Sequence, residues 1–298
     1  MIGAQATDGA PGPIAIGGVG GSGTRVVASV LKECGFFLGN DLNKRYDNLW
    51  YTLMFRRRSL AGASTAEIAR LADIFVAAMS GTGCTDPEAH ELLEQIAGED
   101  REEFKPEWRA TRAKSLRKSL LEGKQHESWA WKEPNTHILL DRLAESIPGL
   151  RYIHVIRDGR DMAFSANQNQ VKFWAEAVFG MDGLDPSAPA GALRYWRLAN
   201  ERIRRLKDDG ALPILEVGFE CLCEHPARQI LAIAEFCGVT VTREGAADIA
   251  ARTVRAPATI GRFQDMDQFQ LDPEDCRYAS ETVSRLFRAL DAHPHLDP

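Results

Sequence analysis

A glycine-rich turn near the amino terminus has the composition of an anion-binding loop. Residues 17–25 read Gly-Gly-Val-Gly-Gly-Ser-Gly-Thr-Arg and stand between an apolar run and a helical pattern that ends at Gly35. Such a loop directs several backbone N–H groups into one concavity at the positive end of the helix dipole. Glycine also lets the backbone approach an anion closely. The turn therefore predicts a phosphate site, although the same residues also fit a structural turn without a ligand.

The residues after this turn argue against ATP chemistry. Gly18 and Gly23 match the two glycines of a G-x-x-x-x-G-K-[ST] loop, but Thr24 stands where the lysine belongs. Arg25 occupies the position of the hydroxyl that ligates magnesium. A P-loop kinase or NTPase is thus the second hypothesis, and a non-catalytic nucleotide-binding protein of the same fold is the third.

A second basic segment follows the clearest strand pattern of the chain. Arg157-Asp158-Gly159-Arg160-Asp161 comes after the run 151–157, and Ser165 lies a little further along. A planar guanidinium can bind two oxygens of a compact dianion, and a serine hydroxyl can donate to a third. A strand-end ion pair would explain Arg157 but not its spacing to Ser165. For Arg160, a ligand contact and a structural ion pair are equally compatible with the sequence.

Together these segments resemble sulfotransferases that use 3′-phosphoadenosine-5′-phosphosulfate. In that family a Ser-Gly-Thr loop holds the 5′-phosphosulfate, and an R-D-x-R-D-x-x-x-S segment holds the 3′-phosphate. Lys132-Glu133-Pro134 is similar to the K-[DE]-P of the tyrosylprotein branch, and residues 260–263 look like the segment that closes over the nucleotide. The resemblance implies donor contacts from Gly20, Gly21, Ser22, Gly23, Thr24, Arg25, Arg157, Ser165, Gly261 and Arg262.

The resemblance also implies catalytic roles, with one departure from the family. Lys132 is expected to serve the transferring sulfuryl group or the leaving oxygen. The family has a cation just before Ser-Gly-Thr, but this chain has Gly21 there, so Arg25 is expected to reach the same anion from the helix start.

The acceptor hydroxyl needs a general base within hydrogen-bond reach. Several relatives have a carboxylate about twenty residues after the loop, which makes Asp41 the first candidate and Asp47 and Glu133 the reserves. Asp41 also suits a turn or a helix N-cap. His154 alternates with apolar residues on a strand, so it fits a satisfied core histidine better than a catalytic one.

Alternating strand and helix patterns predict an α/β fold. We expect a three-layer, P-loop-like domain with a central, mostly parallel sheet flanked by helices. One sulfotransferase-like domain should span residues 1–298, with a flexible tail at 1–12 and a helical insertion or cap at 42–128. Strands are predicted at residues 13–17, 129–134, 151–157 and 212–217, and a short strand or extended segment at 36–39. The longer helices are predicted at 65–79, 136–147, 193–206, 226–237 and 274–290.

Composition limits the partners. The net charge of -6 disfavours a nucleic-acid polymer, which requires a broad basic face. The sequence has neither a signal-peptide pattern nor a long apolar run, so we expect a cytoplasmic protein that does not bind membranes. The six cysteines and seven histidines lack metal-ligand spacing, so no metal is expected. The resemblance implies a small-molecule or glycan acceptor with a hydroxyl or amine and adenosine 3′,5′-bisphosphate as product; a homodimer is left open.

Overall fold

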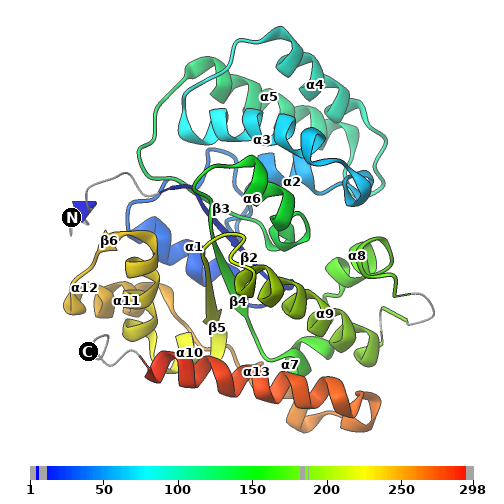
Figure 1. The fold of residues 1–298 in the computed structure, drawn as a ribbon, viewed down its shortest axis with the longest axis vertical. Helices are drawn as coiled ribbons and strands as arrows, with labels where there is room; N and C mark the ends of the chain where they lie inside the picture. Colours follow the sequence, from blue (N-terminus) through cyan, green and yellow to red (C-terminus); the bar gives the residue numbers. More distant parts are fainter. Residues whose placement is uncertain (1–4, 7–11, 182–184, 187, 293–298) are drawn as a thin grey trace.

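A computed structural model describes residues 5–6, 12–181, 185–186 and 188–292 (Figure 1). Its strands are β1 (Gln5–Ala6), β2 (Ile14–Gly17), β3 (Ala130–Lys132), β4 (Arg151–Ile156), β5 (Ile214–Gly218) and β6 (Val239–Thr240). Its α-helices are α1 (Thr24–Glu33), α2 (Leu49–Phe55), α3 (Thr65–Ser80), α4 (Pro87–Gly98), α5 (Pro106–Glu122), α6 (Leu140–Ser146), α7 (Gly159–Ala163), α8 (Asn169–Phe179), α9 (Pro189–Asp208), α10 (Phe219–Glu224), α11 (Pro226–Cys237), α12 (Arg243–Thr253) and α13 (Pro273–Asp291). Short 3₁₀ turns are η1 (Arg58–Gly62), η2 (Pro134–Ile138), η3 (Arg262–Asp265) and η4 (Gln268–Gln270).

The central sheet is parallel, as expected. Within the described residues its four strands lie in the order β3-β2-β4-β5, and every neighbouring pair is parallel. Ile14 is opposite both Ala130 and Arg151, so the three neighbouring strands start level with one another. Because parallel strands end at the same edge, the segments after β2, β3 and β4 meet there, which is where open α/β sheets bind ligands.

Alternation along the strands produces the three layers. Ile14 and Ile16 belong to one buried cluster, with side chains of α1, α11 and α12. Ala15 points the other way, into a cluster that includes side chains of α2, α3, α6 and α9. Side chains of a strand alternate between faces, so a short apolar run can supply both cores at once. The predicted fold class is thereby confirmed.

The region 42–128 is mainly helical and forms the upper part of the molecule in Figure 1. Ser64 starts α3 with a capping box, in which its hydroxyl accepts from the Glu67 N–H while the Glu67 carboxylate accepts from the Ser64 N–H. Buried side chains of these helices share one cluster with Trp131 and Tyr152 of the sheet. The helices therefore rest directly on one face of the sheet, beside the end of β3. The division of the chain into domains stays a prediction.

Three local predictions can be compared with the structure. Residues 36–39 form no regular strand, and Phe37 makes an isolated parallel bridge with Trp129, which fits the alternative of an extended segment. The helix predicted over 136–147 is divided into η2 and α6, because Pro134 starts a 3₁₀ turn first. Of the tail over 1–12, residues 1–4 and 7–11 lie outside the described residues, whereas β1 pairs with β6.

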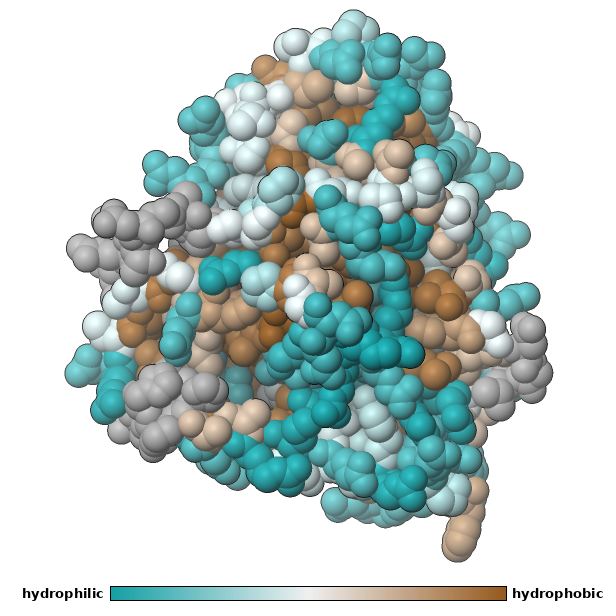
Figure 2. All heavy atoms as spheres, in the orientation of Figure 1, coloured by the Kyte–Doolittle hydropathy of each residue, from teal (hydrophilic) through white to brown (hydrophobic). Residues whose placement is uncertain are grey.

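Figure 2 shows hydrophilic residues over the exposed sides of α9 and α13, as expected for amphipathic helices that cover a core. All six cysteines lie in the described part of the chain and are free thiols. No described helix is both long and apolar enough to cross a bilayer.

Candidate active site

The glycine turn connects the end of β2 to the start of α1. Gly23 is the N-cap of α1 and has a left-handed backbone, with φ of 95°. A Cβ at Gly23 would lie 2.1 Å from a ring carbon of Phe219, so only glycine fits there. The Ser22 hydroxyl is buried and finds no hydrogen-bond partner among the described residues. The turn therefore has the form expected of an anion cradle, and an unsatisfied donor lies within it.

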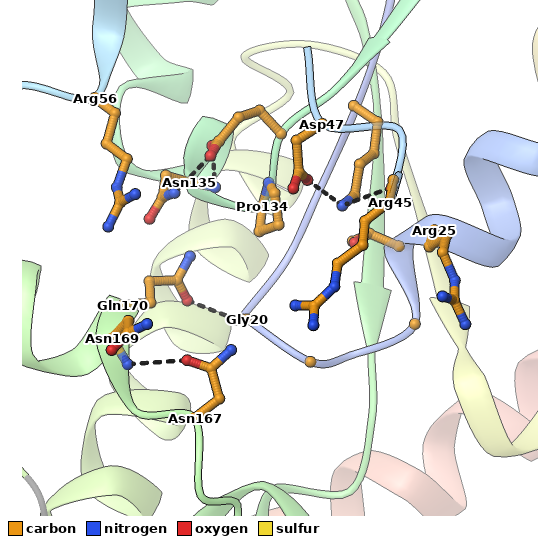
Figure 3. Close-up of a pocket in the computed structure, with 15 residues that line it drawn as sticks. Gly20, Arg25, Arg45, Asp47, Arg56, Pro134, Asn135, Asn167, Asn169 and Gln170 are labelled. Atoms are coloured by element: carbon orange, nitrogen blue, oxygen red, sulfur yellow. Dashed lines mark hydrogen bonds and ion pairs between the residues drawn. The ribbon is translucent and has the colours of Figure 1, made fainter. Parts of the chain in front are cut away.

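A cavity of about 430 Å³ opens beside this turn (Figure 3). The residues around it come from the glycine turn with the start of α1, from the loop before α2, from Arg56 at the end of α2, from the end of β3 with the turn after it, and from α8 with the loop before it. The cavity is lined by Gly20, Gly21, Gly23, Thr24, Arg25, Arg45, Asp47, Arg56, Lys132, Glu133, Pro134, Asn135, Asn167, Asn169 and Gln170. Hereafter "the site cavity" means the space enclosed by these residues.

Lys132 is fixed in the site cavity by a short loop. Its Nζ forms an ion pair with Asp47 and donates to the Arg45 carbonyl at 3.4 Å. The loop is held in turn by Asn43, whose Oδ1 accepts from the backbone N–H groups of Arg45 at 2.7 Å and Asp47 at 3.0 Å. The buried ammonium is thus held in position beside a carboxylate of opposite charge.

Glu133 has the environment of a titrating group. Its carboxylate is buried and accepts from the Asn135 backbone N–H at 2.6 Å and side-chain amide at 2.8 Å. Asn135 is oriented by Trp174, whose indole N–H donates to its Oδ1 at 2.8 Å. Burial, and then the nearby charge of Asp47, raise the pKa of Glu133 to about 7. A carboxyl with that pKa can release and take up a proton at neutral pH.

Three arginines also reach the site cavity. Arg25 lies on one side of it, Arg56 lies on the other side near Asn135, and the Arg45 side chain points toward the glycine turn between them (Figure 3). Gly21, where the family has a cation, has a φ of 97°, which a residue with a side chain would adopt only under strain. A cationic side chain would therefore fit poorly at this position of the turn.

Gln170 occupies part of the turn in this structure. Its Oε1 accepts from the Gly20 N–H at 2.8 Å, and its Nε2 donates to the Gly18 carbonyl at 3.4 Å. Gln170 belongs to α8, so this contact connects the turn to a helix far along the chain. An anion that uses the Gly20 N–H would have to replace the Gln170 contact.

The second basic segment lies outside the lining of the site cavity but close to the turn. Arg157 follows β4, and its guanidinium lies 5.6 Å from the centre of the Phe219 ring that packs under Gly23. One guanidinium nitrogen donates to the Thr259 hydroxyl at 3.0 Å and lies 3.3 Å from Asp161. Its Nε is buried and has no hydrogen-bond partner within the described residues.

The segment that contains Gly261 closes over Arg157. The backbone N–H groups of Gly261 and Phe263 donate to the two carboxylate oxygens of Asp161, at 2.8 Å and 3.1 Å. Burial, and then the charge of Arg157, lower the pKa of Arg262. Two arginines therefore crowd around one aspartate, an arrangement that an additional anion would relieve.

Other predicted residues lie as follows. Ser165 is half-buried just after α7, and its Oγ accepts from the Asn167 N–H at 3.3 Å. Arg160 contacts Asp158, at 3.0 Å from Nε and 2.6 Å from the terminal nitrogen. This pairing favours a structural role for Arg160.

The three base candidates differ in their position relative to the site cavity. Asp41 pairs with Arg112 at 2.6 Å and is not among the residues that line the site cavity, whereas Asp47 and Glu133 both line it. Asp41 comes just before the bridge between Leu42 and Asn48, and its ion pair with Arg112 connects this loop to α5. Spacing along the chain could not tell which carboxylate faces the cavity.

His154 is a satisfied core histidine, as the alternation predicts. Its Nδ1 lies 3.1 Å from the Tyr152 hydroxyl and its Nε2 lies 3.0 Å from Asn200 Oδ1, and burial lowers its pKa to about 4. Within the described residues, no group of three or more histidine, cysteine, aspartate or glutamate side chains is placed to hold a metal ion.

Comparison with known proteins decides the family. A family model described as the sulfotransferase family matches residues 13–243. The chain belongs to the sulfotransferase family. The match covers most of the chain, including the glycine turn, Lys132 and Arg157, and makes the protein an enzyme that transfers sulfuryl groups. Among curated proteins, no relative matches the sequence.

Solved sulfotransferases are distant from this chain. The sulfotransferase domain of the Synechococcus PCC 7002 olefin synthase is 18% identical, with a TM-score of 0.49, and the match covers 94% of this sulfotransferase and 98% of that domain. A sulfotransferase from Mycobacterium tuberculosis is 15% identical, with a TM-score of 0.41, and the match covers 88% of this chain and 76% of that one. Retinol dehydratase, solved with androsterone and the inactive cofactor PAP, is 13% identical, with a TM-score of 0.38. That match covers 93% of this chain and 80% of the other.

Sequence reasoning missed several residues of the site cavity. Arg45, Arg56 and Gln170 lie in segments without a recognisable motif. A weak signal existed for Arg56, which opens a run of three arginines. Exposed arginines are common on protein surfaces, so only their placement around one cavity distinguishes these residues.

Proposed function

We propose that this sulfotransferase uses 3′-phosphoadenosine-5′-phosphosulfate as its donor and that the glycine turn and Arg157 hold its two ends. The unsatisfied Ser22 hydroxyl and the turn's backbone fit the 5′-phosphosulfate. The pair Arg157 and Arg262, with Gly261 beside them, fits the 3′-phosphate, and Ser165 after α7 is the hydroxyl proposed to join them. Phe219 packs between the two regions, so one molecule with two anionic ends could contact both.

The reaction requires a nucleophile and a stabilised leaving group. The donor supplies an activated sulfuryl group; the acceptor hydroxyl forms the new S–O bond while the bond to the 5′-phosphate breaks. Lys132 is placed to offset negative charge that builds up on the transferring group and the leaving oxygen. Asp47 keeps the Lys132 ammonium in position. Catalysis in such transfers rests mainly on positioning and charge stabilisation.

Glu133 is the proposed general base. It lines the site cavity, adjoins Lys132 in sequence and has a pKa near 7, so it can accept the proton of the acceptor hydroxyl. Asp47 is less suited to this role because its carboxylate already compensates Lys132. This assignment replaces Asp41, which is paired with Arg112.

Arg45 is proposed to supply the positive charge that Gly21 lacks. Its side chain points toward the glycine turn, and its backbone is fixed by Asn43. Arg25 is the alternative, because it also lines the site cavity from the start of α1. The acceptor is proposed to be a small molecule or glycan, and the free cysteines are compatible with the expected cytoplasmic location.

The observation that carries the proposal is the placement of Lys132, Glu133 and the glycine turn around one cavity. Calorimetry should compare adenosine 3′,5′-bisphosphate with ATP and magnesium. We expect tight binding of the bisphosphate without magnesium, followed by sulfuryl transfer to members of a hydroxyl and amine panel. A preference for magnesium-ATP would overturn the proposed donor. Bisphosphate binding without any transfer would favour the non-catalytic alternative.

A further inference from the structure

The Arg56 guanidinium is held in the wall of the site cavity by aromatic rings rather than by an acid. It lies 5.5 Å from the centre of the Phe104 ring and 5.1 Å from the centre of the Phe173 ring. Its Nε is buried without a hydrogen-bond partner, and the part of the chain that the structure describes offers its side chain neither a hydrogen bond nor an ion pair. Two aromatic rings thus lie against a cation that no acid among the described residues pairs with.

The carboxyl groups of the site cavity do not neutralise Arg56. Asp47 is paired with Lys132, and Glu133 accepts two hydrogen bonds from Asn135. Around the whole cavity, four cationic side chains face two carboxyl groups. The lining of the cavity therefore has more cationic than carboxyl side chains, and Arg56 is a cation for which the described residues offer no ion pair.

Arg56 is separated from the region assigned to the donor. In Figure 3 it lies beside Asn135, across the site cavity from Arg25 and from the start of α1. It is close enough to Glu133 for its charge to lower the pKa of that carboxyl in opposition to burial. A hydroxyl next to Glu133 would thus have the rest of its molecule near Arg56.

We propose that Arg56 binds a carboxylate on the acceptor, so that the preferred acceptors are small hydroxy acids. This inference rests on the proposed function, because it assigns the acceptor side of the same cavity. A guanidinium matches a carboxylate through two parallel hydrogen bonds, and the flanking rings keep its plane fixed. Arg56 is then a specificity-determining residue, and Glu133 receives the proton of the hydroxyl that Arg56 brings into place.

Matched acceptor pairs test this directly. 4-Hydroxyphenylacetate is compared with 4-hydroxyphenylethanol, and 6-hydroxyhexanoate with 1,6-hexanediol, so that each pair differs in the anionic group. Calorimetry on the protein saturated with adenosine 3′,5′-bisphosphate measures binding without turnover. At least one carboxylate should bind about tenfold or more tightly than its neutral partner, which is the usual scale of a charge-assisted hydrogen bond. Arg56→Gln should remove this preference, and Arg56→Lys should keep part of it.

Arg58 provides the control. Its guanidinium lies 4.8 Å from the centre of the same Phe173 ring and donates to the carbonyls of Phe173 and Lys172, both at 3.1 Å, and Arg58 is not among the residues that line the site cavity. Arg58→Gln should leave the preference intact. Equal binding of both members of each pair, or a preference that survives Arg56→Gln, overturns the inference while the sulfotransferase assignment stands. Absence of bisphosphate binding overturns the proposed donor, and this inference with it.

The two roles of the Arg56 charge are separable by kinetics. If Arg56 acted only by shifting the pKa of Glu133, Arg56→Gln would move the pH profile equally for both members of a pair. A role in recognition instead raises KM for the carboxylate member alone. Equal changes for both members would contradict the proposal.

Discussion

The Arg157 guanidinium donates to the Thr259 hydroxyl at 3.0 Å, which joins the end of β4 to a segment about a hundred residues later. Asp161 stabilises the same contact, because it lies 3.3 Å from Arg157 and accepts the Gly261 N–H at 2.8 Å. The closing segment therefore depends on the residue that is proposed to bind the 3′-phosphate. Nucleotide binding and ordering of this segment should be coupled.

Arg157→Gln should weaken the binding of adenosine 3′,5′-bisphosphate much more than the binding of 5′-AMP, because only the bisphosphate carries the 3′-phosphate that Arg157 is proposed to contact. Loss of a charge-assisted contact corresponds to about a tenfold to hundredfold weaker bisphosphate complex. Calorimetry with both nucleotides measures the difference. Arg160→Gln is the matched control, since Arg160 is engaged with Asp158. An equal loss for both nucleotides would show that Arg157 acts on the fold and not on the 3′-phosphate.

Arg45→Ala should reduce kcat by about a hundredfold, which is the usual cost of removing one group that stabilises transition-state charge. The affinity for the bisphosphate product should change little, because the product lacks the sulfuryl group. Steady-state kinetics and calorimetry on the same variant separate these effects. If Arg25→Ala causes the larger fall in kcat, the cation comes from the start of α1 and Arg45 has no such role.

Glu133 should determine the pH dependence of the reaction. Burial raises its pKa to about 7, and only the ionised form can accept a proton, so kcat/KM should rise with pH and level off above about 7. At pH 6 it should be about tenfold below the plateau. Glu133→Gln should lower kcat by about two orders of magnitude or more and abolish the rise of kcat/KM with pH. If Asp41→Asn abolishes the rise of kcat/KM with pH and Glu133→Gln does not, the base is Asp41.

The same pKa predicts a stability effect that does not depend on substrate. The folded protein holds a proton on Glu133 between the unfolded-state pKa near 4.5 and the folded value near 7, so the free energy of unfolding falls as pH rises through this window. Glu133→Gln lacks this contribution. Chemical denaturation at pH 5 and pH 8 should show the variant gaining stability relative to the parent at the higher pH. A constant difference between the two proteins would mean that Glu133 does not titrate in this range.

Gly23→Ala should damage the turn. Its φ of 95° disfavours any side chain, and the new Cβ would overlap the Phe219 ring. We expect a loss of about 2 kcal/mol or more in the free energy of unfolding, together with weaker bisphosphate binding. Gly98→Ala in α4 is the control, because a Cβ there meets no atom within 4 Å. Retention of full stability in Gly23→Ala would show that the turn adapts to a side chain.

The sequence by itself determined the parts of this protein that depend on local pattern. Glycines after an apolar run predicted the turn, and alternating apolar residues predicted strands that end beside Lys132 and Arg157. Strand and helix periodicity, turns and short motifs are properties of neighbouring residues, so they can be read before the fold is known. The family followed from the same motifs.

Only the tertiary structure decided which side chains share the site cavity. Lys132 and Asp47 are 85 residues apart along the chain and form an ion pair, while Asp41 forms an ion pair with Arg112. The pKa of Glu133 depends on burial by many distant residues, and the orientation of Arg56 depends on Phe104 and Phe173. Distances between remote segments and the loss of solvent around a charge arise from packing, and spacing along one sequence does not encode them.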